Sequence, residues 1–169
     1  MKELIGDYDQ FVANINWGLD EMGIERNDLA MMDHLCYRVE TVRRYVELRR
    51  QIGRKARLLG VSQVNGRDIA TFEFPEPLET CEWRIPYLEL PEPKRGSPHP
   101  EGLEHAEFVT AGSLEWFESK YEHLPFTHNG MNKAINPELG LKHAGISVKF
   151  HEQPLGAVVR IENRLAEGR

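Results

Sequence analysis

The chain is poor in cysteine, has no excess of positive charge and contains no long hydrophobic run. Its only cysteines, Cys36 and Cys81, do not form a CxxC pair, and two are too few for a disulfide framework. We therefore expect a reducing, cytoplasmic location, with both thiols buried in strands. Acidic residues at Asp7 and Asp9 and the lack of any long apolar stretch predict neither a signal peptide nor a membrane span.

The charge balance excludes one class of partner. Lys and Arg number 21 against 27 Asp and Glu, which gives a formal net charge of −6. Neutralising nucleic-acid phosphates requires a basic face, so we expect no nucleic-acid partner. With 40% hydrophobic residues in 169, the chain can bury a core as one domain or as one domain of two small modules. The expected partner is a small molecule, and the expected state is a monomer or a homodimer.

One short pattern occurs twice. Asp33 precedes His34 and Glu104 precedes His105; each histidine opens an alternating strand and has an aromatic residue three positions later. A helical pattern follows each strand, and the two histidines lie 71 residues apart. Two copies of one supersecondary unit would explain this order. Each copy would then contribute one histidine from its first strand.

The first 30 residues read as a helical extension that packs on the main fold. Apolar residues recur there at helical spacing, from Leu4 through Phe11 to Met22, and Gly23 is a suitable helix end. The remainder, 31–169, is predicted to be a single domain. Its first module would span about 31–93, and its second about 101–169, with the proline-rich 91–100 between them.

The first module is predicted to be β-α-β-β-β. Expected elements are a strand at 34–39, a helix at 41–52 and strands at 57–64, 68–74 and 81–90. Asn65-Gly66 is a strong signal for a hairpin between the strands at 57–64 and 68–74. In the first strand His34 lies opposite an apolar face, so it should point to a polar surface or cavity. Pro86 indicates an edge position or a bulge in the last strand.

The second module is expected to repeat this order. Predicted elements are a strand at 103–110, a helix at 113–121 capped by Ser113, short strands at 124–126 and 131–135, a turn at 137–140 and a strand at 145–151. A closing helix at 154–166 would place Val158, Ile161 and Leu165 inside. The fold class is therefore α+β, with two tandem βαβββ modules between an N-terminal helical extension and a C-terminal helix.

These features resemble the YecM family, within the vicinal oxygen chelate superfamily that includes glyoxalase I, extradiol dioxygenases and methylmalonyl-CoA epimerase. The resemblance extends over nearly the whole chain from residue 31. It rests on five stretches: 32–39 (MDHLCYRV), 64–67 (VNGR), 88–91 (LELP), 102–109 (GLEHAEFV) and 147–151 (SVKFH). It implies a cup-shaped mixed sheet that holds one divalent metal ion.

The resemblance also implies where the ligands lie, namely on the first and last strands of each module. Carried onto this sequence, these positions are His34, Glu89 and His105. The fourth is His151, with Glu152 in reserve, and a site with three protein ligands also fits. Imidazole and carboxylate donors suit Fe(II), Mn(II), Ni(II) or Zn(II).

Two further polar residues share the histidine face of their strands. Arg38 could clamp a substrate carboxylate, and Glu107 could serve as a catalytic base. Simple pairing with neighbours is the favoured explanation for each of them. The expected function is a metal-dependent isomerase, lyase or oxygenase for a small oxygen-rich metabolite. The alternatives are a non-catalytic small-molecule-binding protein, or a structural or regulatory protein with a vestigial site.

Overall fold

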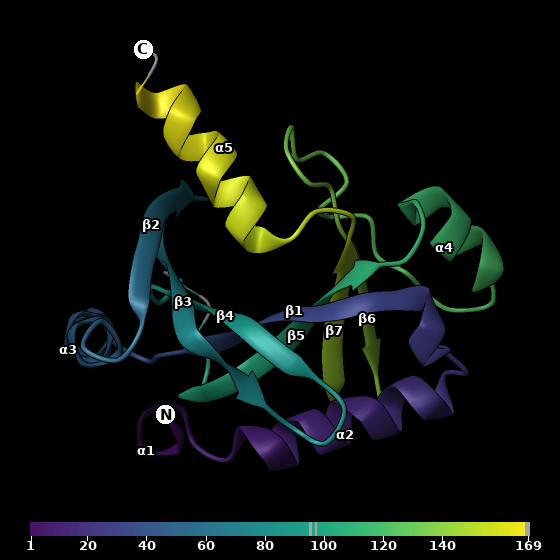
Figure 1. The fold of residues 1–169 in the computed structure, drawn as a ribbon, viewed down its shortest axis with the longest axis horizontal. Helices are drawn as coiled ribbons and strands as arrows, with labels where there is room; N and C mark the ends of the chain where they lie inside the picture. Colours follow the sequence, from purple (N-terminus) through teal and green to yellow (C-terminus); the bar gives the residue numbers. More distant parts are fainter. Residues whose placement is uncertain (95, 97, 168–169) are drawn as a thin grey trace.

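A single curved sheet of seven strands organises the molecule (Figure 1). The computed structural model describes residues 1–94, 96 and 98–167. Its elements are α1 (Lys2–Ile5), α2 (Tyr8–Glu21), a 3-10 turn η1 (Arg26–Asp28), β1 (Leu29–Arg38), α3 (Val42–Ile52), β2 (Arg57–Val64), β3 (Arg67–Glu79), β4 (Arg84–Pro91), β5 (Gly102–Thr110), α4 (Leu114–Lys120), β6 (Leu139–His143), β7 (Ile146–His151) and α5 (Leu155–Glu167). The strand order is β2-β3-β4-β1-β5-β7-β6.

The sheet consists of two halves with matching pairings. In the first half β1 pairs in parallel with β4, and β4 and β2 each pair antiparallel with β3. In the second half β5 pairs in parallel with β7, and β7 pairs antiparallel with β6. The halves join through the antiparallel β1–β5 pair. The predicted α+β fold with a mixed sheet and helices at both ends is thus confirmed.

The second half is shorter at its outer edge. Where the first half has β2, the second has only a bridge between Thr127 and Gly140. The short strands predicted at 124–126 and 131–135 are wrong, because this segment forms turns and bends. The turn predicted at 137–140 is also wrong, since Leu139 and Gly140 begin β6. Much of the loop instead lines a cavity described below.

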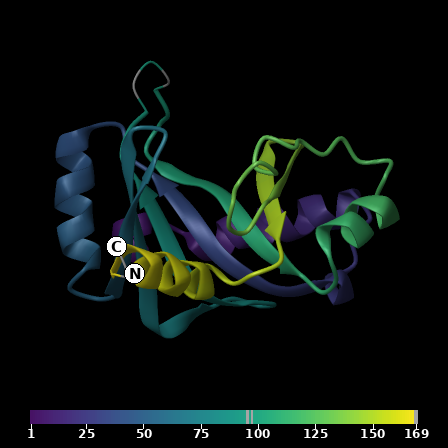
Figure 2. The ribbon, with the colours of Figure 1, turned by 90° about the horizontal axis from the view of Figure 1, so that it is seen from above.

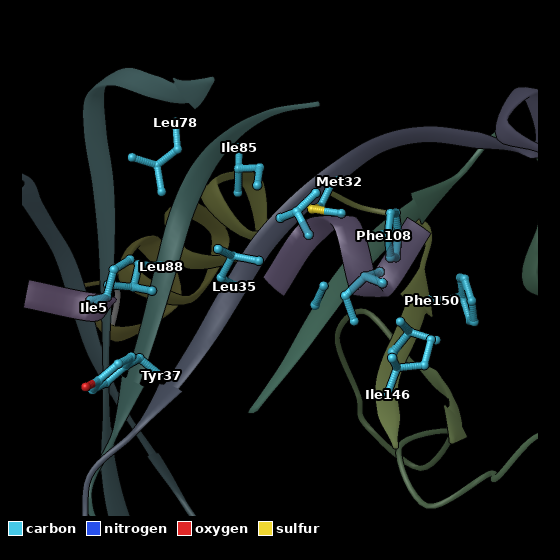
Figure 3. Close-up of a cluster of buried hydrophobic side chains, with 14 of the residues drawn as sticks. Ile5, Met32, Leu35, Tyr37, Leu78, Ile85, Leu88, Phe108, Ile146 and Phe150 are labelled. Atoms are coloured by element: carbon cyan, nitrogen blue, oxygen red, sulfur yellow. The ribbon is translucent and has the colours of Figure 1, made fainter. Parts of the chain in front are cut away.

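The hydrophobic core lies between the sheet and α2. The strands contribute Met32, Leu35, Phe108 and Phe150, all fully buried, as Figure 3 shows. Helix α2 crosses beneath β5 and β7 (Figure 1). A Cβ atom at Gly18 of α2 would overlap Cδ1 of Ile146 on β7, so the glycine lets helix and strand pack closely without moving that side chain. The predicted packing of the N-terminal extension follows from this contact.

Local signals in the sequence set most element boundaries. The side chains of Thr41 and Ser113 accept hydrogen bonds from the first turns of α3 and α4, as N-caps do. Asn65 and Gly66 have φ values of 52° and 76°, the left-handed conformation required by a type I′ hairpin turn. The predicted β2–β3 hairpin therefore forms at the predicted residues.

Other local predictions need correction. Strand β4 lies inside the sheet, so the edge position predicted for Pro86 is wrong. The alternative, a bulge, is confirmed, because the β3–β4 register shifts between Tyr87 and Ile85, the neighbours of Pro86. Cys36 is buried, but Cys81 is exposed and outside any strand. In α5, Ile161 and Leu165 are exposed, because the helix packs across β2 through its other side (Figure 2).

Candidate metal site on the concave face of the sheet

Two adjacent rows of side chains, each crossing several strands, form the candidate site. In one row His105 pairs with Cys36, Cys36 with Glu89, and Glu89 with Thr71. In the next row His34 pairs with Glu107, and Glu107 with Lys149. Paired residues on neighbouring strands project to the same face of a sheet. The sheet therefore brings His34, Glu89 and His105 to one face, opposite the core.

Two β-bulges explain the acid that precedes each histidine. The β1–β5 register shifts by one residue at Asp33 and again at Glu104. A bulge redirects a side chain, so both acids can reach their own histidines. Asp33 Oδ2 lies 2.8 Å from His34 Nδ1, and Glu104 Oε2 lies 3.2 Å from His105 Nδ1. The sequence repeat thus encodes two equivalent acid–histidine pairs.

Glu107 lies at the centre of the cluster. Its Oε1 is 3.0 Å from His105 Nε2, 3.4 Å from His34 Nε2 and 2.8 Å from Lys149 Nζ. Glu89 Oε2 lies 3.8 Å from His34 Nε2. Donor atoms of His34, Glu89 and Glu107 all lie within 4.8 Å of one another. One ion could therefore contact all three side chains.

Neighbouring charges have a larger effect than burial on the pKa values of the side chains in this cluster. Burial disfavours charge on His34, but Glu107 and Asp33 raise the pKa of His34 well above its usual value. Burial would raise the pKa of Glu107, yet His34 and Lys149 hold that pKa well below its usual range. Glu107 and Glu138 likewise raise the pKa of Lys149 against burial. Glu107 is thus an ionised carboxylate among cations.

Lys149 occupies the position that corresponds to Glu89. The 71-residue offset places Leu35 over Ala106, and these residues pair with each other at the centre of the sheet. Leu35 is in register with Leu88 on β4, and Ala106 with Val148 on β7. The next residues are Glu89 and Lys149. The last strand of the second half therefore presents an ammonium group where that of the first presents a carboxylate.

The remaining predicted site residues lie around this centre. His151 is one row beyond Lys149, with Nε2 3.6 Å from both Asp33 Oδ2 and Glu107 Oε2. Burial lowers the pKa of His151. Glu152 lies elsewhere, because its carboxylate accepts a hydrogen bond from the Leu114 amide.

Arg38 does not extend into the cavity. Its Nη1 donates to both oxygens of Glu104 at 3.1 Å, so its charge is already paired. Arg38 therefore binds the carboxylate of Glu104, not that of a substrate. The alternative that the sequence left open, pairing with a neighbour, describes its contacts.

A cavity of about 590 Å³ opens above the cluster. Its apolar lining comes from β2, β3 and α5, through Val64, Ile69, Val158 and Val159. The second-half loop closes a further side with Asn129 to Asn136. Figure 1 shows α5 and this loop on the same side of the sheet, away from α2. The cluster is thus accessible to a small molecule.

Three contributors were not identified from sequence as site residues: Asp33, Glu104 and Lys149. The first two were visible as the acid before each histidine, but alternation on a regular strand would place them on the opposite face. Lys149 could have been found by aligning the ends of the last strands. That alignment requires the register, which the sequence does not display.

Two tandem half-sheets, joined through their first strands and carrying one histidine each, define the vicinal oxygen chelate fold. Methylmalonyl-CoA epimerase from Mycobacterium tuberculosis is similar to this chain at 12% identity and a TM-score of 0.53, over 76% of this chain and 91% of that one. Within that fold class the chain belongs to the YecM protein family, whose sequence model matches residues 1–135.

Two relatives match most of the chain. Protein YecM of Escherichia coli (strain K12) is 29% identical over 167 residues, which cover 96% of this chain and 80% of that protein. The solved structure of a structural-genomics target, Protein EC4020, has a TM-score of 0.73 at 24% identity and covers 90% of this chain and 87% of that one. In the described part of the chain, no helix is long and apolar enough to cross a membrane.

Proposed function

We propose that this protein binds one divalent metal ion through His34, Glu89 and Glu107, with His105 alongside. One observation carries the proposal. His34 Nε2 is buried, has no hydrogen-bond partner among the described residues, and lies near two carboxylates. Because Asp33 accepts from Nδ1, the free lone pair of a neutral ring would be on Nε2. A bound metal ion would replace the Nε2 proton that the neighbouring carboxylates favour, so this buried nitrogen suits a metal ligand.

The donor set fits the metals expected from the sequence. Imidazole nitrogen and carboxylate oxygen bind Zn(II), Fe(II), Mn(II) and Ni(II), with zinc bonds of about 2.0–2.2 Å. Donor atoms that lie within 4.8 Å of one another can surround an ion at such distances. His151 forms a second donor group with Asp33 and His34 on the far side of the ring. It remains a candidate for a further ligand.

The proposed activity is isomerase, lyase or oxygenase chemistry on a small oxygen-rich metabolite. A bound divalent ion would supply Lewis acidity towards a substrate oxygen. Asp33 and Glu104 would hold the two imidazole rings in position, as carboxylates behind metal-binding histidines do. Lys149 would bring a fixed positive charge to the same face and so stabilise negative charge that develops on the substrate.

A non-catalytic small-molecule-binding protein is the second candidate. The observation that favours it concerns Glu107, the residue expected to act as a base. His105 and Lys149 contact its carboxylate directly, and its pKa is held low. A carboxylate stabilised in this way is a weak base but a good ligand. In this case the site would bind its ligand without converting it.

Metal analysis is the first test. Protein purified without a histidine tag should contain close to one equivalent of Zn, Fe, Mn or Ni, or take up one equivalent on titration. His34→Ala should lose this binding and remain folded by circular dichroism. A parent protein that binds none of the four metals would refute the proposal and leave the site vestigial. Turnover of metal-loaded protein on small hydroxy- and oxo-compounds then separates the enzyme from the binder.

A further inference from the structure

Arg67 is the cation in the cavity whose charge is left without a counter-ion. In the cavity, Lys149 is paired with Glu107 and Glu138, and Lys133 with Glu138. Arg38, which lies outside the cavity, is paired with Glu104. Arg67 lines the same cavity, but among the described residues no carboxylate lies within ion-pair distance of its guanidinium group. Its one hydrogen bond runs from Nη1 to the backbone oxygen of Glu92, at 3.1 Å. Most of its donors therefore remain available.

Arg67 lies on the same face of the sheet as the proposed metal site. Arg67, Ile69 and Thr71 alternate along β3 and all line the cavity. Thr71 is paired with Glu89, a member of the cluster. Arg67 thus stands on the same face of the sheet, four residues or about 13 Å of strand from that pair. Arg67 and the cluster therefore line the same cavity at separate positions.

The surroundings of Arg67 are unfavourable for an unpaired charge. The residue is half-buried, and burial lowers the pKa of its guanidinium group, as does the nearby Arg38. A buried charge is costly unless it is paired. An anionic ligand would provide the missing partner.

We propose that the cavity takes a small carboxylic acid whose carboxylate pairs with Arg67 and whose oxygen donors, at its other end, face the metal cluster. The pairing with Arg67 stands by itself, whereas the placement of the oxygen donors rests on the proposed metal site. A guanidinium fork matches a carboxylate with two parallel hydrogen bonds. Phosphate is disfavoured because its second charge would meet Glu89, Glu104 and Glu162, which also line the cavity. The ligand is therefore a carboxylate with one charge at this end.

The test compares ligands that differ only at this end. Zn²⁺-loaded protein is titrated by calorimetry with 2-oxoglutarate and with 2-oxopentanoate, in which a methyl group replaces the distal carboxylate. Oxaloacetate and 2-oxoadipate vary the chain length. The parent should bind at least one diacid about 10- to 100-fold more tightly than 2-oxopentanoate, as expected for hydrogen bonds to a charged group. Arg67→Met should reduce this preference to within about twofold.

The variants isolate the guanidinium group. Arg67→Met should keep the parent affinity for Zn²⁺ and for 2-oxopentanoate. Arg67→Lys keeps the charge without the fork and should show an intermediate preference. Arg84→Met removes an exposed arginine that is paired with Glu79 and does not line the cavity, so it should behave like the parent. A preference that survives in Arg67→Met, or that is lacking in the parent, overturns the assignment.

Two further arms separate the remaining outcomes. If the parent binds no Zn²⁺, the proposed function fails by itself, and the Arg67 site is measured with glutarate on metal-free protein. Glutarate binding that Arg67→Met weakens about tenfold or more supports the assignment, and unchanged or missing binding overturns it. Inorganic phosphate that displaces 2-oxoglutarate at equal concentration would overturn the choice of carboxylate over phosphate.

Discussion

The two halves of the sheet share a pairing scheme but differ in the chemistry they present. Each half provides an acid–histidine pair on its first strand, through the bulges at Asp33 and Glu104. On the last strand, however, the first half presents Glu89 and the second presents Lys149. The second half also replaces an outer strand with the loop that lines the cavity.

This difference shows how a duplicated fold can build one asymmetric site. The equivalent of Glu107 in the first half is Cys36, so the central carboxylate also comes from only one half. Glu89 and Glu107 together supply two negative charges, and Lys149 returns one positive charge to the same surface. The histidines and their supporting acids are common to both halves, whereas the charge balance is set by residues that differ between them.

The largest expected effect breaks the symmetry of the two histidines. His34→Ala should weaken Zn²⁺ affinity more than 100-fold, beyond the 10- to 100-fold typical of losing a supporting residue. His105→Ala should cost less, because its Nε2 is occupied by Glu107 at 3.0 Å. Calorimetric titrations of both variants provide the comparison.

Phe108→Ala is the matched control on the opposite face of β5. It should lower the free energy of unfolding by about 3–5 kcal/mol, since it empties a fully buried ring site, and leave metal affinity unchanged. Equal loss of affinity in the two histidine variants would contradict the asymmetry. Unfolding of His105→Ala as severe as that of Phe108→Ala would make His105 a structural residue.

The second effect tests whether Asp33 and Glu104 support metal binding equally. Asp33→Asn and Glu104→Gln should each reduce metal affinity about 10- to 100-fold, because each acid holds the Nδ1 atom of its histidine. Glu152→Gln is the control, because the Glu152 carboxylate binds the Leu114 amide and contacts neither histidine. A variant that binds metal like the parent would show that its acid–histidine pair serves only folding.

The third effect exchanges the two unlike residues on the last strands. Glu89→Gln should weaken metal binding, whereas Lys149→Met should strengthen it about tenfold, since it removes a like charge next to the ion. Titrations at low and high salt would measure both changes. Weaker binding in Lys149→Met would mean that the ammonium group is needed to position Glu107.

The smallest effect concerns the helix that covers the second half. Asp28 accepts hydrogen bonds from Lys120 Nζ, at 2.6 Å, and from the Tyr121 hydroxyl, next to α4. Burial would raise the pKa of Asp28, but both partners outweigh it and lower that pKa. Its stabilisation, about 1–3 kcal/mol for hydrogen bonds to a charged group, is therefore complete above the usual aspartate pKa near 3.9.

This stabilisation should be lost as the pH falls through the lowered pKa. Asp28→Asn should remove that part of the pH dependence, as measured by urea unfolding between about pH 2 and pH 6. The same acid-dependent loss in the variant and the parent would assign it to other carboxylates.

Sequence patterns predicted the first half better than the second. The strand at 57–64 and the hairpin at Asn65-Gly66 have strong local signals, and both form at the predicted residues. Strand β6 begins at Leu139-Gly140, two residues after Pro137, where the local signal indicates a turn. Its strand character comes from pairing with β7, a contact that local sequence cannot display.

The candidate site divides in the same way. The acid–histidine repeat pointed to His34 and His105 because both signals are local. Choosing between Arg38 and Arg67 as the free guanidinium group was beyond local reasoning, since Glu104 pairs with one across the sheet and leaves the other. Register likewise decides that Lys149, rather than His151, corresponds to Glu89.

One oxygen atom joins the closing helix to the candidate metal site. Asp33 Oδ2 accepts from His34 Nδ1 and also from the backbone amide of Leu155, at 2.9 Å, at the start of α5. A carboxylate at a helix N-terminus is favoured by the helix dipole, so the seating of α5 and the orientation of the His34 ring share one anchor. The start of α5 and the His34 ring are therefore coupled through one carboxylate oxygen. If metal binding holds the His34 ring more firmly, hydrogen exchange at the Leu155 amide should slow when the site is loaded.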